Sequence, residues 1–350
     1  MRAGWLAVLV SVTSALGAPA QSLPNEQPLT RIAFGSCNRE YRPQILWPAI
    51  LANQPQLWIW LGDIVYGRAD VPGDLARRYD SEKKMPGYQA LLHQARVIGM
   101  WDDNDYGVKD GGAVNPNKVE SQRLLLNFLD EPADSPRRKQ AGIYTSYTFG
   151  PPGRQVKVLL LDTRYFREEA PSLWSHFFGQ AAPTPRILGE EQWQWLEQQL
   201  THSTADIHFI CSGYQVIAEE QPFEKWNEIP RARQRLFDLL AKTQPRNPII
   251  LSGDRHLGEI SRAVDPRLRQ PIYDITSSGM THHATNNILF NFDQEPNRFR
   301  VGHNYVTYNF GFIEINWDAS PPVVSLQVRG EKNNIAVAAN LTLAPVAPAP

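Results

Sequence analysis

The feature that most constrains this chain is a series of short apolar runs, each followed within two residues by Gly, Ser or Asp. The runs are continuously apolar rather than alternating, which is typical of strands buried on both faces. They lie at residues 31–34, 57–61, 97–101, 156–161, 207–211, 249–251 and 272–275. Helical patterns separate several of the runs, and this order predicts an α/β fold with a layered, mostly parallel sheet.

Three segments carry apolar residues at helical spacing, namely 189–200, 231–243 and a stretch that includes Leu124, Leu125 and Phe128. Residues 306–328 read as two or three strands without helices, which predicts an antiparallel addition to the sheet. From Glu331 the chain is polar and then rich in Ala and Pro, so we expect 331–350 to form a loose tail. The folded domain is then expected to span residues 31–330.

The first twenty residues have the pattern of a secretory signal peptide. Arg2 supplies the positive charge, Leu6–Leu16 is mostly apolar, and Ala18-Pro19-Ala20 offers small residues for cleavage near Ala20. This run is too short to span a bilayer of about 30 Å, and no later segment is long and apolar enough. We therefore expect an exported protein, periplasmic or extracellular, with no membrane span in the mature chain.

Charge and cysteine content exclude two classes of protein. The formal net charge of −1 over 350 residues gives no bulk attraction to nucleic acid, and no nucleic-acid-binding surface is evident in the sequence. Two cysteines, Cys37 and Cys211, are too few for a disulfide scaffold. Cys211 lies in an apolar run and is interpreted as a plain buried residue.

Side chains with metal-binding chemistry follow several of the predicted strands. They are Cys37, Asp63, Asp102, Asp103, Asp162, Asp254 and His256. Ligands bind beyond the carboxyl ends of strands in open α/β sheets, so we expect these side chains to gather on one side of one sheet. Converging carboxylates repel one another unless cations neutralise them. The pattern therefore predicts a metal site.

The donor types narrow the choice of metal. Asp63 and Tyr66 are three residues apart after a strand, so both can reach one ion. Asp254 and His256 stand at i and i+2 and share a face in extended backbone, so each can serve one of two adjacent ions. Carboxylate, imidazole, phenolate and thiolate donors suit Fe, Zn or Mn better than Mg alone. Two adjacent ions about 3.5–4 Å apart would suit in-line displacement at a phosphoryl group.

Each of these residues also has a structural interpretation. Cys37 can be a small buried residue and Tyr66 a packing aromatic. Asp102 and Asp103 can be turn or helix-capping acids. Asp162 can be a turn acid or can orient Arg164.

Six motifs give the chain a resemblance to a known family. In order they are Phe34–Asn38 (FGSCN), Leu61–Gly67 (LGDIVYG), Trp101–Gly107 (WDDNDYG), Leu161–Arg167 (LDTRYFR), Leu251–His256 (LSGDRH) and Thr276–His282 (TSSGMTH). Over residues 31–328 the chain resembles the alkaline phosphatase D (PhoD-like) family of metallophosphatases. The resemblance implies two facing mixed β-sheets flanked by helices.

The resemblance also implies hydrolysis of small phosphomonoesters or phosphodiesters. The family arrangement implies a ferric iron with calcium, with Zn, Mn and Mg as alternatives. By position, Cys37, Asp63, Tyr66 and His256 would hold the first ion, Asp63 would bridge, and Asp254 would hold the second ion.

The chain departs from the family pattern at two positions. Asn104 stands where the family has a His that acts as general acid, and Lys109 stands where it has an Asn that binds metal. We assign Asp103, Asn104, Lys109 and Arg164 to catalysis. The departures leave a second hypothesis beside the active enzyme, a catalytically weakened relative that binds phosphate-bearing ligands.

Overall fold

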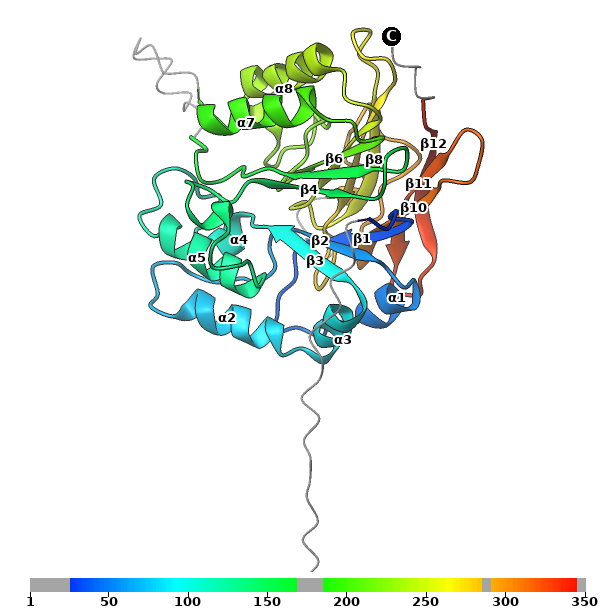
Figure 1. The fold of residues 1–350 in the computed structure, drawn as a ribbon. Helices are drawn as coiled ribbons and strands as arrows, with labels where there is room; N and C mark the ends of the chain where they lie inside the picture. The colour runs from blue at the N-terminus through cyan, green and yellow to red at the C-terminus, as the bar shows by residue number, and fades with distance from the viewer. Residues whose placement is uncertain (1–25, 169–184, 285–290, 345–350) are drawn as a thin grey trace, which may run out of the picture.

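A computed structural model of the chain describes residues 26–168, 185–284 and 291–344. Two six-stranded mixed sheets pack face to face, with helices on both outer sides (Figure 1). This is the fold class that the family resemblance implied. The predicted signal peptide, residues 1–20, and the residues from 345 onward lie outside the described part of the chain.

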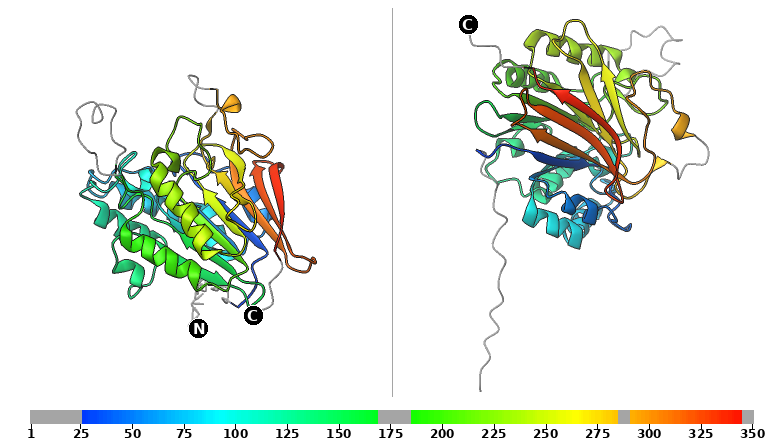
Figure 2. Two further views of the ribbon diagram at one scale, coloured as in Figure 1. Left: turned by 90° about the horizontal axis from the view of Figure 1, so that it is seen from above. Right: turned by 90° about the vertical axis from the view of Figure 1, so that its right-hand side faces the viewer.

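The first sheet joins a parallel half to an antiparallel half, in the order β12-β11-β10-β1-β2-β3. β1 (Arg31–Gly35), β2 (Leu57–Leu61) and β3 (Arg96–Met100) run parallel. β10 (Asn309–Asn316) and β11 (Val323–Gly330) continue the sheet as antiparallel neighbours, orange to red beside blue β1 in Figure 2. The predicted antiparallel addition is confirmed.

The edge strand β12 (Ile335–Thr342) corrects the expectation that residues 331–350 form a loose tail. It pairs antiparallel with β11, from Thr342 opposite Val323 to Ile335 opposite Arg329. Val337, Ala339 and Leu341, two residues apart, pack toward the hydrophobic core. This period of two is that of a half-buried strand. The alternation is weak in the sequence because small Ala residues fill the strand, and the stretch that follows it is rich in Ala and Pro.

The second sheet has the order β4-β5-β6-β7-β9-β8. Its four central strands run parallel, and they are β5 (Val156–Leu160), β6 (Ile207–Ser212), β7 (Pro248–Ser252) and β9 (Ile272–Ser277). Antiparallel strands β4 (Thr145–Phe149) and β8 (Gly258–Ala263) form the two edges. The sequence did not predict β4 or β8.

All seven predicted strands are present, but they divide between the two sheets. The first three belong to one sheet and the other four to its partner, so the expectation of a single sheet is wrong. The reason is physical, because a continuous apolar run reports that a strand is buried on both faces but not which strand it pairs with.

Helices cover the outer face of each sheet (Figure 1). On the second sheet these are α7 (Glu190–Thr201) and α8 (Pro230–Thr243), whose Trp193, Leu196 and Leu236 pack with Ile210 and Ile250. Around the first sheet lie α1 (Trp47–Ala52), α2 (Asp74–Lys83), α3 (Pro86–Gln94), α4 (Asp103–Tyr106) and α5 (Lys118–Phe128). The three helices that the sequence predicted are α5, α7 and α8.

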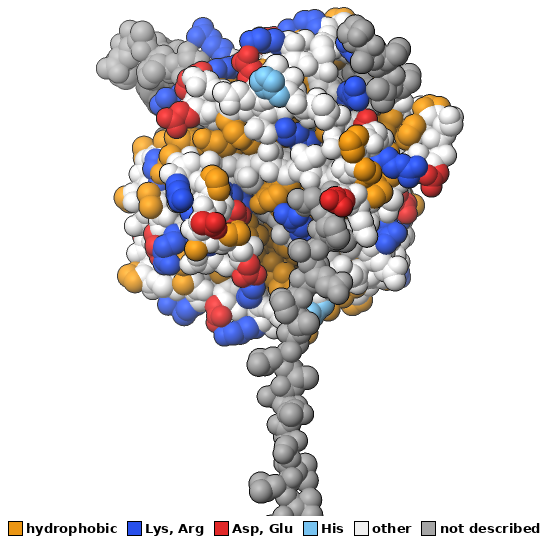
Figure 3. All heavy atoms as spheres, in the orientation of Figure 1, with side chains coloured by type: hydrophobic (Ala, Val, Ile, Leu, Met, Phe, Trp, Pro, Cys, Tyr) orange, Lys and Arg blue, Asp and Glu red, His pale blue; other side chains and the backbone are white. Residues whose placement is uncertain are grey.

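Short 3₁₀ turns complete the described chain, at Pro136–Arg138, Trp226–Glu228 and Phe292–Gln294. Within the described residues, no helix combines the length and the apolar character needed to cross a bilayer. On the part of the face in Figure 3 that the grey atoms leave visible, Lys and Arg side chains are scattered among Asp and Glu side chains.

Candidate metal centre

The candidate site residues occupy equivalent positions after the parallel strands. The second residue beyond the end of five parallel strands carries a candidate side chain, namely Cys37 after β1, Asp63 after β2, Asp102 after β3, Asp162 after β5 and Asp254 after β7. The carboxyl ends of the two sheets meet, since Arg164 after β5 donates from Nε to Asp102 Oδ1 at 2.6 Å. The site therefore lies between two sheets, at the edge where their parallel halves end.

A cavity of about 890 Å³ opens at this edge. Six of the nine residues assigned from the sequence line it, and they are Tyr66, Asp103, Asn104, Lys109, Asp254 and His256. Cys37 and Asp63 lie beneath it, both buried and in contact. The remaining residue, Arg164, is not part of the wall.

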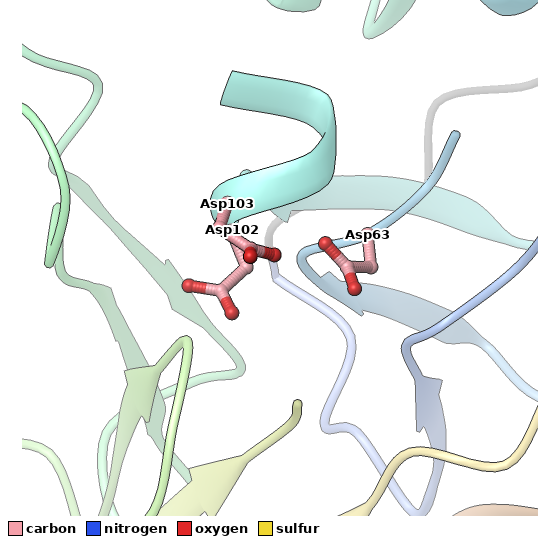
Figure 4. Close-up of side chains that lie close together, drawn as sticks. All are labelled: Asp63, Asp102 and Asp103. Carbon is pink, nitrogen blue, oxygen red and sulfur yellow. The ribbon is translucent and has the colours of Figure 1, made fainter. Parts of the chain in front are cut away.

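Asp63 is the centre of the cluster. Its carboxylate accepts hydrogen bonds from Tyr66 Oη at 2.8 Å and from Asn104, whose main-chain N and side-chain Nδ2 lie at 3.1 and 2.9 Å. Cys37 Sγ lies 3.7 Å from Asp63 Oδ2, the oxygen that also accepts from Tyr66 Oη and Asn104 Nδ2. Oxygen atoms of Asp63, Asp102 and Asp103 lie within 4.8 Å of one another, as Figure 4 shows at the start of α4.

The electrostatics of this cluster call for a cation. Burial, and then the charges of Asp103 and Asp102, raise the pKa of Asp63 well above its usual value. Burial, Glu224 and Asp103 raise the pKa of Asp254 to about 7. Burial also raises the pKa of Cys37 and of Tyr66, and Asp63 adds to both shifts. A positive ion reverses each of these effects because it stabilises the charged donors.

The residues present fit such an ion. Asp102 Oδ2 is buried and has no hydrogen-bond partner among the described residues. Thiolate, phenolate, imidazole and carboxylate donors together match a transition metal rather than Mg or Ca alone.

The backbone at the candidate ligands is unusual. Cys37, Asp63, Asp254 and His256 have φ values of 61°, 52°, 69° and 56°, in the left-handed region that disfavours L side chains. Four of the ten non-glycine residues with positive φ in the described chain are therefore candidate ligands. Backbone strain of this kind concentrates at functional sites.

A glycine beside Asp63 permits the close approach of the two loops. Gly62 has φ of 95°, and a Cβ atom there would lie 2.4 Å from the Asp102 Cβ. Any larger residue at this position would separate the loop after β2 from the loop after β3.

Arg164 lies behind the cavity wall. Its side chain is fully buried and pairs with Asp102 on one side and with Glu224 on the other, with its guanidinium 5.0 Å from the centre of the Tyr214 ring. We interpret Arg164 as a residue that positions Asp102 and Glu224 rather than one that contacts a ligand. Glu224 lines the cavity and was not singled out from the sequence.

Lys109 and Asp103 have different surroundings. Lys109 is exposed at the cavity mouth. Asp103 is buried, accepts a hydrogen bond from Asn104 Nδ2 at 2.6 Å, and accepts another from the main-chain N of Asp110 at 2.8 Å. Lys109 can therefore contact a ligand in the cavity from the solvent side, whereas Asp103 would contact the ligand from the buried side of the cavity.

Asp105 is a positioning residue that sequence reasoning missed. Its carboxylate accepts from the main-chain N of Ile64 at 3.0 Å and of Asp102 at 2.6 Å. It thereby ties the loop after β2 to the loop after β3. The Asp102-x-x-Asp105 spacing at the start of α4 is that of a capping box, and this was the available signal.

His282 was also missed, although it closes the last of the six sequence motifs. Its Nε2 atom lies 3.0 Å from Tyr66 Oη and 2.9 Å from His256 Nε2. Burial lowers the pKa of His256 to about 4 and that of His282 to about 2, so both rings are neutral. The available signal was its place at the end of the sixth motif, in the loop that follows the strand at 272–277.

The two facing mixed sheets and the cluster between their carboxyl ends define the metallophosphatase class of fold. The family model for PhoD-like phosphatases matches residues 32–319, and the chain belongs to that family. Its enzyme class is that of hydrolases acting on phosphoric ester bonds. No curated protein sequence matches the chain.

Solved structures of low sequence identity share the fold. A structure of PhoD has a TM-score of 0.66 at 18% identity and covers 91% of this chain and 69% of its own. A purple acid phosphatase, PPD1 from yellow lupin (Lupinus luteus) seeds, has a TM-score of 0.62 at 13% identity, with 91% and 55% covered. GAP50, described as the anchor in the inner membrane complex of Plasmodium, has a TM-score of 0.58 at 12% identity, with 91% and 90% covered.

Proposed function

We propose that the chain hydrolyses small phosphomonoesters or phosphodiesters in this cavity with the help of bound metal ions. The observation that carries the proposal is the convergence of buried donors on Asp63, beneath a solvent-open cavity whose floor is acidic and whose mouth carries Lys109. Cys37, Asp63, Tyr66 and His256 would hold a first ion, and Asp63 and Asp254 a second.

Iron and calcium are the ions we propose, with Zn, Mn and Mg as alternatives. Such ions, when bound, supply charge stabilisation and a water molecule activated for attack. The chain's own groups then fix the geometry. Asn104 holds the Asp63 carboxylate through two hydrogen bonds, Arg164 and Asp105 hold the loop that carries Asp102, and Asp103 and Lys109 would face the bound ester.

The test is hydrolysis of mono- and bis-p-nitrophenyl phosphate by metal-replete and by chelated protein. We expect turnover in the replete protein, its loss on chelation and its return with added metal. Asp80→Asn is a matched control for substitutions in the cluster, because Asp80 is an exposed helix residue paired with Lys84. Turnover that survives complete removal of metal would overturn the proposal.

A specific observation favours a second candidate, the weakened relative that binds phosphate-bearing ligands. Asn104 donates its amide to Asp63 and Asp103 and has no proton to give to a leaving group. Metal-replete protein that binds phosphate but hydrolyses neither ester would favour this candidate over the first.

We also propose that the chain is exported. The support is the charged, apolar and small-residue pattern of residues 1–20. Expression of the full chain, followed by N-terminal sequencing of the protein outside the cytoplasm, tests this. A mature N-terminus near residue 21 is expected, and an intact Met1 on cytoplasmic protein would contradict it.

A further inference from the structure

Two histidines in the core of this molecule have different hydrogen-bond partners. His208 is fully buried, and each of its ring nitrogens has a partner, Arg246 O at 2.7 Å for Nδ1 and Ser203 Oγ at 2.7 Å for Nε2. His282 is 5% exposed, its Nδ1 has no partner among the described residues, and its Nε2 contacts only candidate ligands. His208 has the partners of a structural histidine, and His282 does not.

The partners of His282 Nε2 form a continuous chain of donor atoms. Asp63 Oδ2 lies 2.8 Å from Tyr66 Oη. Tyr66 Oη lies 3.0 Å from His282 Nε2, and the same nitrogen lies 2.9 Å from His256 Nε2. Two ligands at right angles, each about 2.1 Å from an ion, are about 3 Å apart. The spacing in this chain equals that of neighbouring atoms in one coordination shell, and it is also the spacing of ordinary hydrogen bonds.

The count of protons in this chain of atoms is compatible with a shared cation. Tyr66 has one proton and directs it to Asp63. Two neutral imidazole nitrogens that face each other can form a hydrogen bond only if one of them carries a proton. With both protons on Nδ1, no proton lies between the two Nε2 atoms and the Tyr66 oxygen, and a shared cation would satisfy all three.

The loop that carries His282 is fastened to the other ligand loops. The main-chain N and Oγ1 of Thr281 each lie 3.3 Å from Cys37 O, and Arg39 N donates to Thr281 Oγ1 at 2.6 Å. On the other side of His282, Ala284 N donates to His256 O at 2.7 Å. These bonds hold His282 between the loop of Cys37 and the loop of His256.

We infer that His282 Nε2 is a further ligand of the ion that Cys37, Asp63, Tyr66 and His256 hold. The inference rests on the proposed metal function, since it adds a donor to that centre. Two imidazoles beside a phenolate and a thiolate also favour a transition metal over calcium at this position.

The experiment compares metal affinity in wild type, His282→Ala and the matched control His283→Asn. His283 is the next residue in the same loop and also lines the cavity, but its ring packs against Tyr308 and contacts no candidate ligand in the described hydrogen bonds. Purified full-length proteins are stripped with chelator, checked for folding by circular dichroism, and titrated with Fe, Zn and the spectroscopic probe Co(II). The readouts are metal per chain, the visible absorption of the bound ion and the rise in Tm on binding.

We expect His282→Ala to bind the ion at least 10- to 100-fold more weakly, because loss of even an outer-shell partner typically costs that much. Its Co(II) spectrum should change, and His283→Asn should match wild type. Equal affinity and spectrum in His282→Ala would overturn the inference, as would an equal loss in both variants. Failure of wild type itself to bind a transition metal would instead contradict the proposed function.

Discussion

Asp63 and Asp162 stand in the same kind of place, two residues past the end of a parallel strand, and both are buried. Asp162 accepts four hydrogen bonds, all from N–H groups that cannot bind a metal. The donors are Trp101 Nε1 and the main-chain N atoms of Ile143, Arg164 and Tyr165. Asp63 is bonded to Tyr66, Cys37 and Asn104, two of which are candidate ligands, and other acids surround it.

The difference between these two regions lies in partner chemistry rather than in burial or position. A carboxylate that main-chain N–H groups satisfy completes the fold. A carboxylate that faces other acids keeps its charge at neutral pH only if a cation stabilises it. Four substitutions test this distinction, in order of decreasing expected effect.

Asp63→Asn should have the largest effect. An amide removes the charge at the centre of the donor cluster, so the ions and the turnover should both be lost. We expect turnover to fall by at least about 10³-fold, more than the loss of one oxyanion-hole donor costs. Ester hydrolysis and elemental analysis measure this. A variant that kept the wild-type metal content would show that Asp63 does not differ from Asp162.

Asp162→Asn should act on stability instead. The amide turns an acceptor into a donor that faces buried N–H groups, so the free energy of unfolding should fall by about 3 kcal/mol. The folded fraction should keep its metal and its turnover. Denaturant unfolding and metal analysis of the same sample measure both quantities. Loss of metal without loss of stability would reverse the roles given to the two acids.

Asn104→His tests whether position 104, which donates hydrogen bonds to Asp63, can also supply a proton to the leaving group. The imidazole would supply a proton that the amide lacks, and general acid catalysis contributes about 10²–10⁴-fold. We expect about 10²-fold faster hydrolysis of alkyl phosphoesters, which have poor leaving groups, and little change for p-nitrophenyl esters. A leaving-group series on both proteins decides this. Equal slopes would show that position 104 serves only to hold Asp63.

The fourth substitution concerns His208, a buried histidine whose partners, like those of Asp162, complete the fold. Burial lowers its pKa to about 4, below about 6.5 in the unfolded chain. The unfolded state therefore binds more protons between these values, and stability falls as the pH decreases through this window. We expect about 2 kcal/mol less stability at pH 5 than at pH 7 from this residue.

The measurement for His208 is denaturant unfolding of metal-free wild type and His208→Gln at both pH values. Gln does not titrate, so the variant should lose less stability on acidification, by that same amount. An identical pH dependence in the two proteins would show that His208 is not held neutral in the folded state.

The sequence predicted the seven strands that are buried on both faces because their local composition is continuously apolar, and it missed the edge strands β4, β8 and β12. It did not predict how the seven strands divide between two sheets, because strand pairing depends on contacts distant in sequence. β12 was missed for a local reason, since alternation at 335–342 is weak where small Ala residues fill the strand.

The candidate site residues also divide into those that local sequence reveals and those that depend on contacts distant in sequence. Cys37, Asp63 and Asp254 were found because each follows a predicted strand directly. The position of Arg164 behind the cavity wall depends on Asp102 and Glu224, which come from other parts of the chain. His282 lies five residues past its strand, and only the folded loop brings it to Tyr66.

The left-handed backbone at Cys37, Asp63, Asp254 and His256 has a consequence for the evolution of this fold. A lineage that no longer needs the ion is released from keeping side chains that oppose the local backbone, which costs about 1–2 kcal/mol per residue. Gly or Asn would accumulate first at these four positions, because both tolerate that conformation. A descendant with glycines there would keep the architecture and have lost the donors for the metal, and its sequence alone would reveal that loss.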